Sequence, residues 1–354
     1  MKILHAADLH LDTPFTGHGP AEVSYLKRAL LSVPEKIADV CNAHGCDLVL
    51  LAGDLFDGDA TAESIHALKT ALCAINVPIF ITPGNHDFCA PASPWLMETW
   101  PEHVHIFTKP VMESVCLPQL DCRVYGAGYT AMDCPPLLEN FRAEGSETYH
   151  IALLHGDPVQ RNAPYCPITQ AQVAASGLHY LALGHVHKAG SFTAGTTLCA
   201  WPGCPMGRGN DETGEKGLYI VTLEDTARAE WVALDTPRFH DLEAEVLTTP
   251  EDALAGLLPA AGSEDFYRVT FTGESAPFDP DALLRTDMPH LQLRDRTVPP
   301  ADLWACIQAD SLEGVYFRML HDALQSADEA VAEELLLAAR ISRRILDGRE
   351  VHLP

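Results

Sequence analysis

Five short polar motifs follow five apolar segments of the chain, and they contain the side chains that divalent cations prefer. The motifs are DLH, GDLFD, GNHD, LLHG and GHVH. They offer carboxylate, imidazole and amide donors and no thiolate. This donor set suits Mn, Fe or Zn ions and disfavours a structural zinc site. The residues concerned are Asp8, His10, Asp54, Asp57, Asn85, His86, His155, His185 and His187. We therefore expect a metal centre assembled from distant parts of the sequence.

Each motif alone has an ordinary structural explanation. Asp8 and His10 could belong to a capped turn, and a single histidine after a strand, such as His155, is more often hydrogen-bonded than bound to metal. All five motifs nevertheless come directly after apolar segments, and ligands gather at the carboxyl ends of strands in open α/β sheets. Residues two apart on an extended segment also point to the same side, which lets His185 and His187 converge. The joint pattern favours one shared site.

The apolar segments before the motifs have the length and composition of buried strands, and amphipathic helices separate them. Helical periodicity extends over residues 25–44 and again over residues 62–75, and short strands with turn signals follow over 190–235. The expected strands are 2–7, 47–52, 78–82, 150–154 and 180–184. Together these elements predict an α/β fold over residues 1–237, a four-layer α/β/β/α sandwich with two mixed sheets between helices.

The pattern changes at TPRF, residues 236–239, which indicates a domain boundary. Residues 238–300 alternate short strands with helices, one of which is expected at 279–285, and predict a small α+β domain. Residues 301–354 predict a helical C-terminal tail, in which apolar residues recur at steps of three and four. This apolar stripe consists of Val331, Leu335, Ala338, Ile341 and Ile345. The stripe would either pack on the preceding domain or dock against a partner protein, and the sequence leaves both alternatives open.

Composition limits the classes of function. The 354 residues include 23 basic and 49 acidic side chains, which gives a net charge of −26. A protein that binds DNA by itself usually carries a basic face, so a DNA substrate would be held mostly by a partner. The 11 cysteines are scattered without a CxxC pair, and no apolar run reaches the roughly 20 residues that span a bilayer. We expect reduced thiols, no membrane segment and a cytoplasmic location.

The ordered motifs resemble the signature of the calcineurin-like metallophosphoesterase superfamily across residues 1–190. Within that superfamily, the opening ILHAADLHLDTPF and the later YLALGHVHK are similar to the SbcD/YhaO-like branch of DNA repair exonucleases. The run WPGCPMGRGNDETGEKG, residues 201–217, resembles the loop that follows the last ligand strand in that branch. The resemblance also implies that residues 238–300 form a capping domain.

The family pattern, carried over residue by residue, implies a site for two divalent metal ions. The first ion would be bound by Asp8, His10 and His187. The second would be bound by Asn85, His155 and His185, and Asp54 would bridge both ions. His86 would lie outside the metal shell near the leaving group, and Asp57 would orient it. Manganese is the first choice of metal, with iron or zinc as alternatives.

The resemblance implies a two-metal-dependent phosphodiester hydrolase in which a metal-bridging hydroxide attacks the phosphate. The specific expectation is a DNA repair exonuclease subunit, SbcD-like, that acts on DNA beside a large SbcC-like coiled-coil ATPase; a homodimer is a further assembly to consider. Two other functions stay open. One is a small-substrate phosphodiesterase or protein phosphatase on the same site, and the other is a non-catalytic scaffold, against which the intact ligand set argues.

Three further residues are candidates for contact with the substrate. Arg208 lies in a glycine-rich loop and could bind a phosphate, with a solvated hairpin arginine as the alternative. Arg161 and Tyr165 lie in the loop after His155 and could line the substrate entrance. For these two, surface residues without a role in catalysis are the favoured alternative, although loops of this length often carry function.

Overall fold

The structure is a computed structural model that describes residues 1–160, 162–300 and 302–348. The chain divides into two compact units. Unit 1 contains Met1–Asp241, Gly262–Arg268 and Asp287–Leu291, and unit 2 contains Leu242–Ala261, Val269–Thr286 and Gln292–Pro354. The three-part division made from the sequence stays a prediction.

Unit 1 contains a first six-stranded sheet with the strand order β12-β11-β1-β2-β3-β4. Strands β1 to β4 are parallel, β11 is antiparallel to β1, and β12 is antiparallel to β11. The strands are β1 (Lys2–Ala6), β2 (Leu48–Leu51), β3 (Ile79–Ile81), β4 (Val104–Ile106), β11 (Gly217–Leu223) and β12 (Ala227–Ala233). Because β1, β2 and β3 are parallel, the segments that follow them all begin at the same edge of this sheet.

A second six-stranded sheet has the order β5-β6-β7-β8-β10-β9. Strands β6, β7, β8 and β10 are parallel, whereas β5 and β9 are antiparallel to their neighbours. The strands are β5 (Glu113–Leu117), β6 (Cys122–Gly126), β7 (Tyr149–His155), β8 (Tyr180–Gly184), β9 (Lys188–Ala194) and β10 (Thr197–Gly203). A short 3-10 helix, η1 (Pro118–Leu120), connects β5 to β6.

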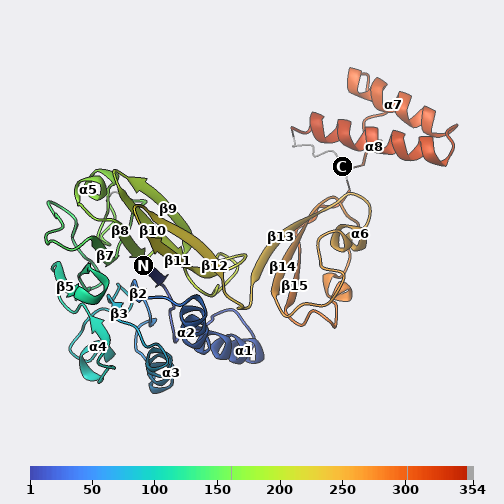
Figure 1. The fold of residues 1–354 in the computed structure, drawn as a ribbon. Coiled ribbons are helices and arrows are strands. Elements are labelled where there is room, and N and C mark those ends of the chain that lie inside the picture. The colour runs from blue at the N-terminus through green and yellow to red at the C-terminus, as the bar shows by residue number, and fades with distance from the viewer. Residues whose placement is uncertain (161, 301, 349–354) are drawn as a thin grey trace. The chain divides into compact units, whose positions relative to one another are not determined.

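The two sheets pack face to face, and helices cover their outer faces (Figure 1). Between the sheets, Ile3 and Leu50 of the first share one buried cluster with Val124 and Leu153 of the second. The covering helices of the first sheet are α1 (Pro20–Leu31), α2 (Val33–His44) and α3 (Ala62–Cys73). Helix α4 (Pro94–Met97) follows β3, and α5 (Gln170–Ala175) packs on the second sheet. The predicted four-layer α/β/β/α sandwich is thus confirmed.

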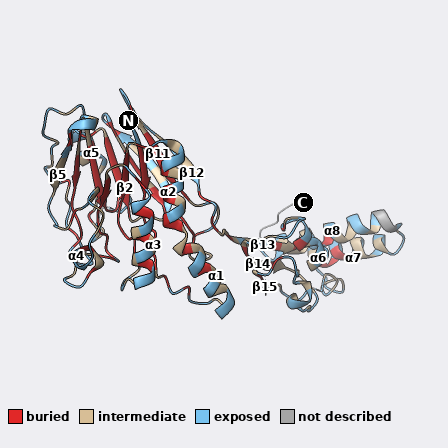
Figure 2. Ribbon diagram, turned by 60° about the horizontal axis from the view of Figure 1, so that its bottom comes forward, coloured by how far each residue is buried: buried red, intermediate tan, exposed pale blue. Residues whose placement is uncertain are grey.

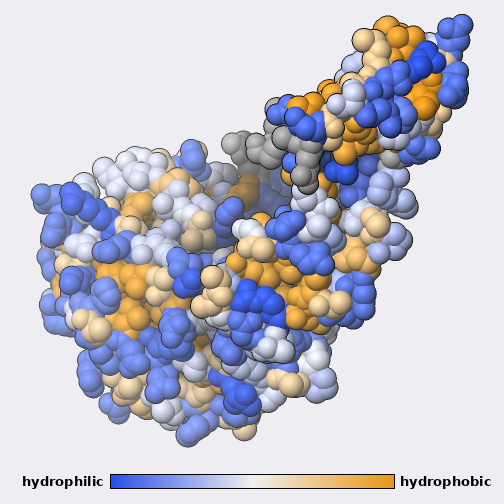
Figure 3. Space-filling model, turned by 90° about the vertical axis from the view of Figure 1, so that its right-hand side faces the viewer, coloured by the Kyte–Doolittle hydropathy of each residue, from blue (hydrophilic) through white to orange (hydrophobic). Residues whose placement is uncertain are grey.

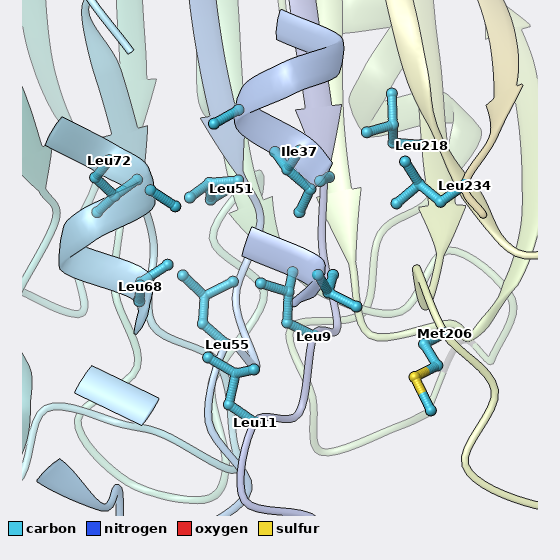
Figure 4. Close-up of a cluster of buried hydrophobic side chains, with 14 of the residues drawn as sticks. Leu9, Leu11, Ile37, Leu51, Leu55, Leu68, Leu72, Met206, Leu218 and Leu234 are labelled. Carbon is cyan, nitrogen blue, oxygen red and sulfur yellow. The ribbon is translucent and has the colours of Figure 1, made fainter. Parts of the chain in front are cut away.

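The apolar faces of the helices are what attach them to the first sheet. Ile37, Leu68 and Leu72 point from α2 and α3 toward Leu51, as Figure 4 shows. The burial of one such side chain stabilises a fold by about 1.5–3 kcal/mol. Figure 2 shows the resulting pattern, in which the strands are buried and the outer sides of the helices are exposed.

The helical periodicity over residues 25–44 belongs to two helices and not to one. Helix α1 ends at Leu31, α2 begins at Val33, and Ser32 caps both. Pro34 is the physical reason, because it has no backbone N–H to continue the hydrogen-bond ladder and its ring collides with the carbonyl four residues before it. The apolar period continues across the break, so both helices still face the same core.

The C-terminal region contains a three-stranded sheet of order β13-β14-β15, followed by two helices. The segment expected to be helical at 279–285 is a 3-10 helix of four residues. The elements are β13 (Phe239–Val246), α6 (Pro250–Ala255), β14 (Phe266–Gly273), η2 (Pro280–Leu283), β15 (Leu291–Asp295), α7 (Leu312–Leu324) and α8 (Glu329–Leu346). Within the described ranges, no helix is long and apolar enough to cross a membrane.

Candidate metal centre

The segments after the parallel strands are tied together by their backbones. The amide of Asp8 donates to the carbonyl of Gly53 at 3.0 Å, and the amide of His10 donates to the carbonyl of Asp54 at 2.9 Å. Asp8, His10, Asp54 and His185 have φ angles of 55°, 48°, 51° and 92°. Residues other than glycine adopt this left-handed backbone conformation at a cost in free energy, and such strain concentrates at functional sites.

Two glycines let these segments approach closely. A Cβ on Gly84 would lie 2.2 Å from Oδ1 of Asp54, and one on Gly53 would lie 2.5 Å from Nδ1 of His155. Gly53 also has a φ of 84°, which a side chain would strain further. Both positions therefore need glycine for Asp54 and His155 to occupy their places.

One group of possible metal ligands consists of Asp8, His10 and His187, whose donor atoms all lie within 4.8 Å of one another. Nε2 of His10 faces Nε2 of His187 at 3.2 Å. Asp8 and His10 are fully buried, and His187 is half-buried. The structure thus brings together all three residues predicted for the first metal ion.

A second group lies beside the first and shares Asp8 with it. Asp8, Asp54 and His155 form a further set of donors within 4.8 Å. Nε2 of His155 lies 3.3 Å from Oδ2 of Asp54 and 3.0 Å from Oδ1 of Asn85. Nδ1 of His185 lies 3.2 Å from the same oxygen of Asn85. Asp54 also lies 3.8 Å from Nε2 of His10, so its carboxylate is between the two groups.

The hydrogen bonds and charges of the cluster fit metal binding. Nδ1 of His155 donates to the carbonyl of Ala52 at 2.9 Å, and Nε2 is the ring nitrogen that faces Asp54 and Asn85. Burial opposes ionisation of Asp54, but the charges of His155 and His10 outweigh it and lower the pKa of Asp54. A buried carboxylate with imidazole and amide donors is a ligand set for a divalent cation. The residues therefore fit the ions that the pattern predicts.

His86 lies against this cluster, with a different set of contacts. Its ring centroid is 4.8 Å from that of His10, and its backbone amide donates to Oδ1 of Asp54 at 2.8 Å. Nδ1 of His86 lies 2.8 Å from Oδ1 of Asp57, and this hydrogen bond raises the pKa of His86. The nearby rings of His10 and His86 lower the pKa of Asp57. Together the two residues form an imidazole and carboxylate pair at the edge of the cluster.

Glu212 is a residue of the site that none of the five sequence motifs contains. Its Oε1 accepts a hydrogen bond from Nδ1 of His187 at 2.7 Å, and both carboxylate oxygens contact the guanidinium of Arg208. Burial opposes ionisation of Glu212, but the hydrogen bonds to His187 and Arg208 outweigh it and lower its pKa. Arg208 is therefore near the site as predicted, but its guanidinium is engaged by Glu212, and its contact with a phosphate stays a prediction.

The loop after β7 supplies two further contacts to the site. The ring of Tyr165 lies 4.8 Å from that of His185, so one of the two loop candidates borders the cluster. Asp157, which the sequence did not single out, is buried and has an oxygen 3.9 Å from Nε2 of His185. Arg161 lies outside the described residues.

Comparisons with known proteins show which family the chain belongs to. A family model described as calcineurin-like phosphoesterase matches residues 1–189. The chain is 34% identical over 265 residues to the uncharacterized metallophosphoesterase YhaO of Bacillus subtilis (strain 168), and the match covers 68% of this chain and 61% of that protein. It is 25% identical over 260 residues to the probable exonuclease subunit 1 of Escherichia phage T5, covering 67% of this chain and 71% of that protein.

Among solved structures, a dimetal phosphatase from Danio rerio covers 66% of this chain and 98% of its own, with 14% identity and a TM-score of 0.45. The chain spans about three fifths of the length of YhaO, with 61% of that relative matched. The family model alone covers more than half of the 354 residues, including every strand end that carries a candidate ligand. The chain belongs to the calcineurin-like phosphoesterase family, whose members hydrolyse phosphoester bonds at a dinuclear metal site.

Proposed function

We propose that the cluster holds two divalent cations and hydrolyses phosphodiester bonds of DNA. The observation that carries the proposal is the convergence of seven metal-binding side chains from five strand ends. The proposed ligands are Asp8, His10 and His187 for one ion, Asn85, His155 and His185 for the other, and Asp54 for both. Manganese is the ion we propose, although iron and zinc suit the same nitrogen and oxygen donors.

His86 has a separate task in the proposed reaction. The two cations, when bound, supply the Lewis acidity that activates water and neutralises charge on the phosphate. Nδ1 of His86 is held by Asp57, and among the described residues no hydrogen bond engages Nε2. His86 can therefore donate a proton from Nε2 to the departing oxygen, and Asp57 favours the imidazolium from which that proton comes.

A polynucleotide substrate agrees with the name of one relative, and the charge of the chain then requires a partner that binds the DNA. One relative is named a probable exonuclease subunit. The net charge of −26 repels a DNA backbone unless a partner supplies basic surface. The proposed function is therefore that of a nuclease subunit for DNA repair that works beside a coiled-coil ATPase, as the SbcD-like resemblance implies.

The two C-terminal helices offer a surface for such a partner. Leu312 and Met319 of α7 are 87% and 67% exposed, and Ile345 of α8 is 60% exposed. Figure 3 shows apolar surface over these helices. Large apolar side chains gathered on one surface mark contact sites more often than scattered ones do. The partner would cover this surface in the assembled nuclease.

A small-substrate phosphodiesterase is the second candidate, and the acidic charge of the chain favours it. An assay with Mn²⁺ distinguishes the two functions. The purified chain, alone and with its partner, is incubated with linear DNA, with cyclic nucleotides, and with a chromogenic diester and its monoester. The nuclease proposal predicts release of nucleotides from DNA and slow hydrolysis of the monoester. Rapid hydrolysis of a cyclic nucleotide or of the monoester, with intact DNA in the same conditions, would favour the second candidate.

A further inference from the structure

A cavity of about 310 Å³ lies against His86. One wall comes from the loop before α3 and from α3 itself, and the other from the segment between β3 and Glu98, which follows α4. The lining residues that matter to the argument are His86, Phe88, Ala90, Ser93, Met97 and Glu98. A volume of this size is that of a pocket for one small organic group.

The lining of the cavity disfavours a phosphate. Asp59 and Glu98 lie in its wall, and the wall contains neither a lysine nor an arginine, although Glu98 pairs with the nearby Lys69 at 3.0 Å. Asp87 also lines the cavity, but its carboxylate accepts hydrogen bonds from the amides of Gly84 and Leu55. A second phosphate of a substrate would meet the carboxylate of Asp59 here, with no lysine or arginine in the wall to bind it. The cavity therefore suits an uncharged group.

Most of the remaining wall is apolar, with one polar group left over. Phe88 is half-buried, and Met97 is 70% exposed, a large value for an apolar side chain. Ser93 is 9% exposed, and its hydroxyl has no hydrogen-bond partner among the described residues. It precedes α4 in the N-cap position, yet its side chain makes no cap hydrogen bond. An apolar pocket with an aromatic side chain in its wall is suited to a flat ring.

We propose that this cavity is the subsite for the nucleobase attached to the leaving oxygen of the substrate. The inference rests on the proposed nuclease function, because it uses His86 as the proton donor to that oxygen. The group attached to the oxygen then lies on the side of His86, where the cavity is. Phe88 and Met97 contact the faces of the base. The carboxylate of Asp59 in the wall repels the next phosphate.

The test uses dinucleotide diesters that differ only by one missing base. One analogue lacks the base on the leaving side, a second lacks it on the other side, and the parent dinucleotide keeps both. The removal of a base does not change the number of bonds to phosphorus or the class of leaving alkoxide. The nucleoside released from the parent identifies the leaving side. We expect kcat/KM to fall about tenfold when the leaving-side base is missing, the scale of one base stacked on an aromatic side chain, and to change much less for the other analogue.

A substitution that fills the cavity provides an independent measurement. Ala90→Phe places a ring in the cavity, and Ala131→Phe, at an exposed alanine outside it, is the matched control. For Ala90→Phe, the preference for the parent over the leaving-side abasic analogue should fall toward one. For Ala131→Phe the preference should equal that of the unsubstituted protein. Metal content and the melting temperature of both variants are measured, so that unfolding is recognised.

The outcomes separate this inference from the proposed function. If the unsubstituted protein with Mn²⁺ cleaves neither DNA nor any dinucleotide, the nuclease proposal fails. If it cleaves the parent and the leaving-side abasic analogue with equal kcat/KM, nuclease activity stands and the subsite is wrong. A preference that is unchanged in folded, metal-loaded Ala90→Phe would also overturn the subsite, because the base would then bind elsewhere.

Discussion

Oε1 of Glu212 lies 2.7 Å from Nδ1 of His187 and 2.6 Å from Nη2 of Arg208, and the same Nη2 lies 2.8 Å from Nδ1 of His187. Nδ1 cannot donate to Glu212 and accept from Arg208 at once. With Glu212 as the acceptor for both neighbours, the proton of His187 stays on Nδ1, and the lone pair of Nε2 faces His10. Glu212 thereby keeps His187 in the form that binds a metal.

Glu212→Ala should weaken the binding of one of the two Mn²⁺ ions about 10–100-fold, the usual effect of removing such a carboxylate. The loss arises because Arg208 is then free to donate to Nδ1 of His187 and to force the proton onto Nε2. Calorimetric titration with Mn²⁺ measures the affinity without reference to turnover. The double variant Arg208→Ala with Glu212→Ala should recover part of the lost affinity. Equal affinity in the single variant and the unsubstituted protein would show that Glu212 does not position His187.

His86→Ala should retain both metal ions and lose turnover about 100-fold or more, the scale for the loss of a positioned acid catalyst. The reason is that His86 contacts the cluster from its edge and is tied to Asp57. Metal content and turnover are measured on the same preparation. His66→Ala, an exposed histidine on α3, is the matched control. Parallel loss of metal and activity would make His86 a ligand and remove it from the role of proton donor.

Asp57→Asn should cause a milder defect of the same kind. The amide can still hold the ring of His86 but no longer favours its charged form. Thr13 donates to Oδ2 of Asp57 at 3.1 Å and holds the side chain in place in either case. Turnover as a function of leaving-group acidity is the measurement that distinguishes this effect. The defect should shrink for diesters with an acidic phenol as leaving group, which needs no proton, and a defect independent of the leaving group would contradict the assignment.

The sheets and the convergence of the strand-end side chains could be predicted because parallel strands that alternate with helices place their carboxyl ends along one edge. The break at Ser32 was missed because the apolar period is continuous across it, and only Pro34 marks the local hydrogen-bond loss. The helix expected at 279–285 is only a 3-10 helix, Pro280–Leu283, because an element of four residues is too short for a periodic pattern to define its type and length.

The part of the site that the sequence did not reveal lies in irregular loops. Glu212 is 25 residues after His187 in a segment without apolar periodicity. The only signal was an acidic residue four positions after Arg208 in the glycine-rich run, a spacing that an exposed ion pair explains equally well. Asp157 had still less signal, since it follows His155 by two residues in a loop whose course the sequence does not specify.

Deletion of residues 301–354 should leave metal binding and the hydrolysis of a small diester intact, because every proposed ligand lies before residue 190. It should weaken association with the partner ATPase, which co-purification of tagged protein measures. Arg343 and Arg344 pair within the chain with Glu313 and Glu245, so α8 also packs on its own unit. Loss of metal, or insolubility of the shortened chain, would show that the helices belong to the core and not to a docking surface.

The most direct test of the two-metal centre is the metal content of Asp54→Ala, determined by elemental analysis after loading with Mn²⁺. Asp54 lies 3.3 Å from Nε2 of His155 and 3.8 Å from Nε2 of His10, so its carboxylate lies between the residues proposed for the two ions. The unsubstituted protein should carry two ions per chain, as should the control Asp39→Ala at an exposed position of α2. Asp54→Ala should lose both ions. Two ions per chain in folded Asp54→Ala would contradict the assignment of the site.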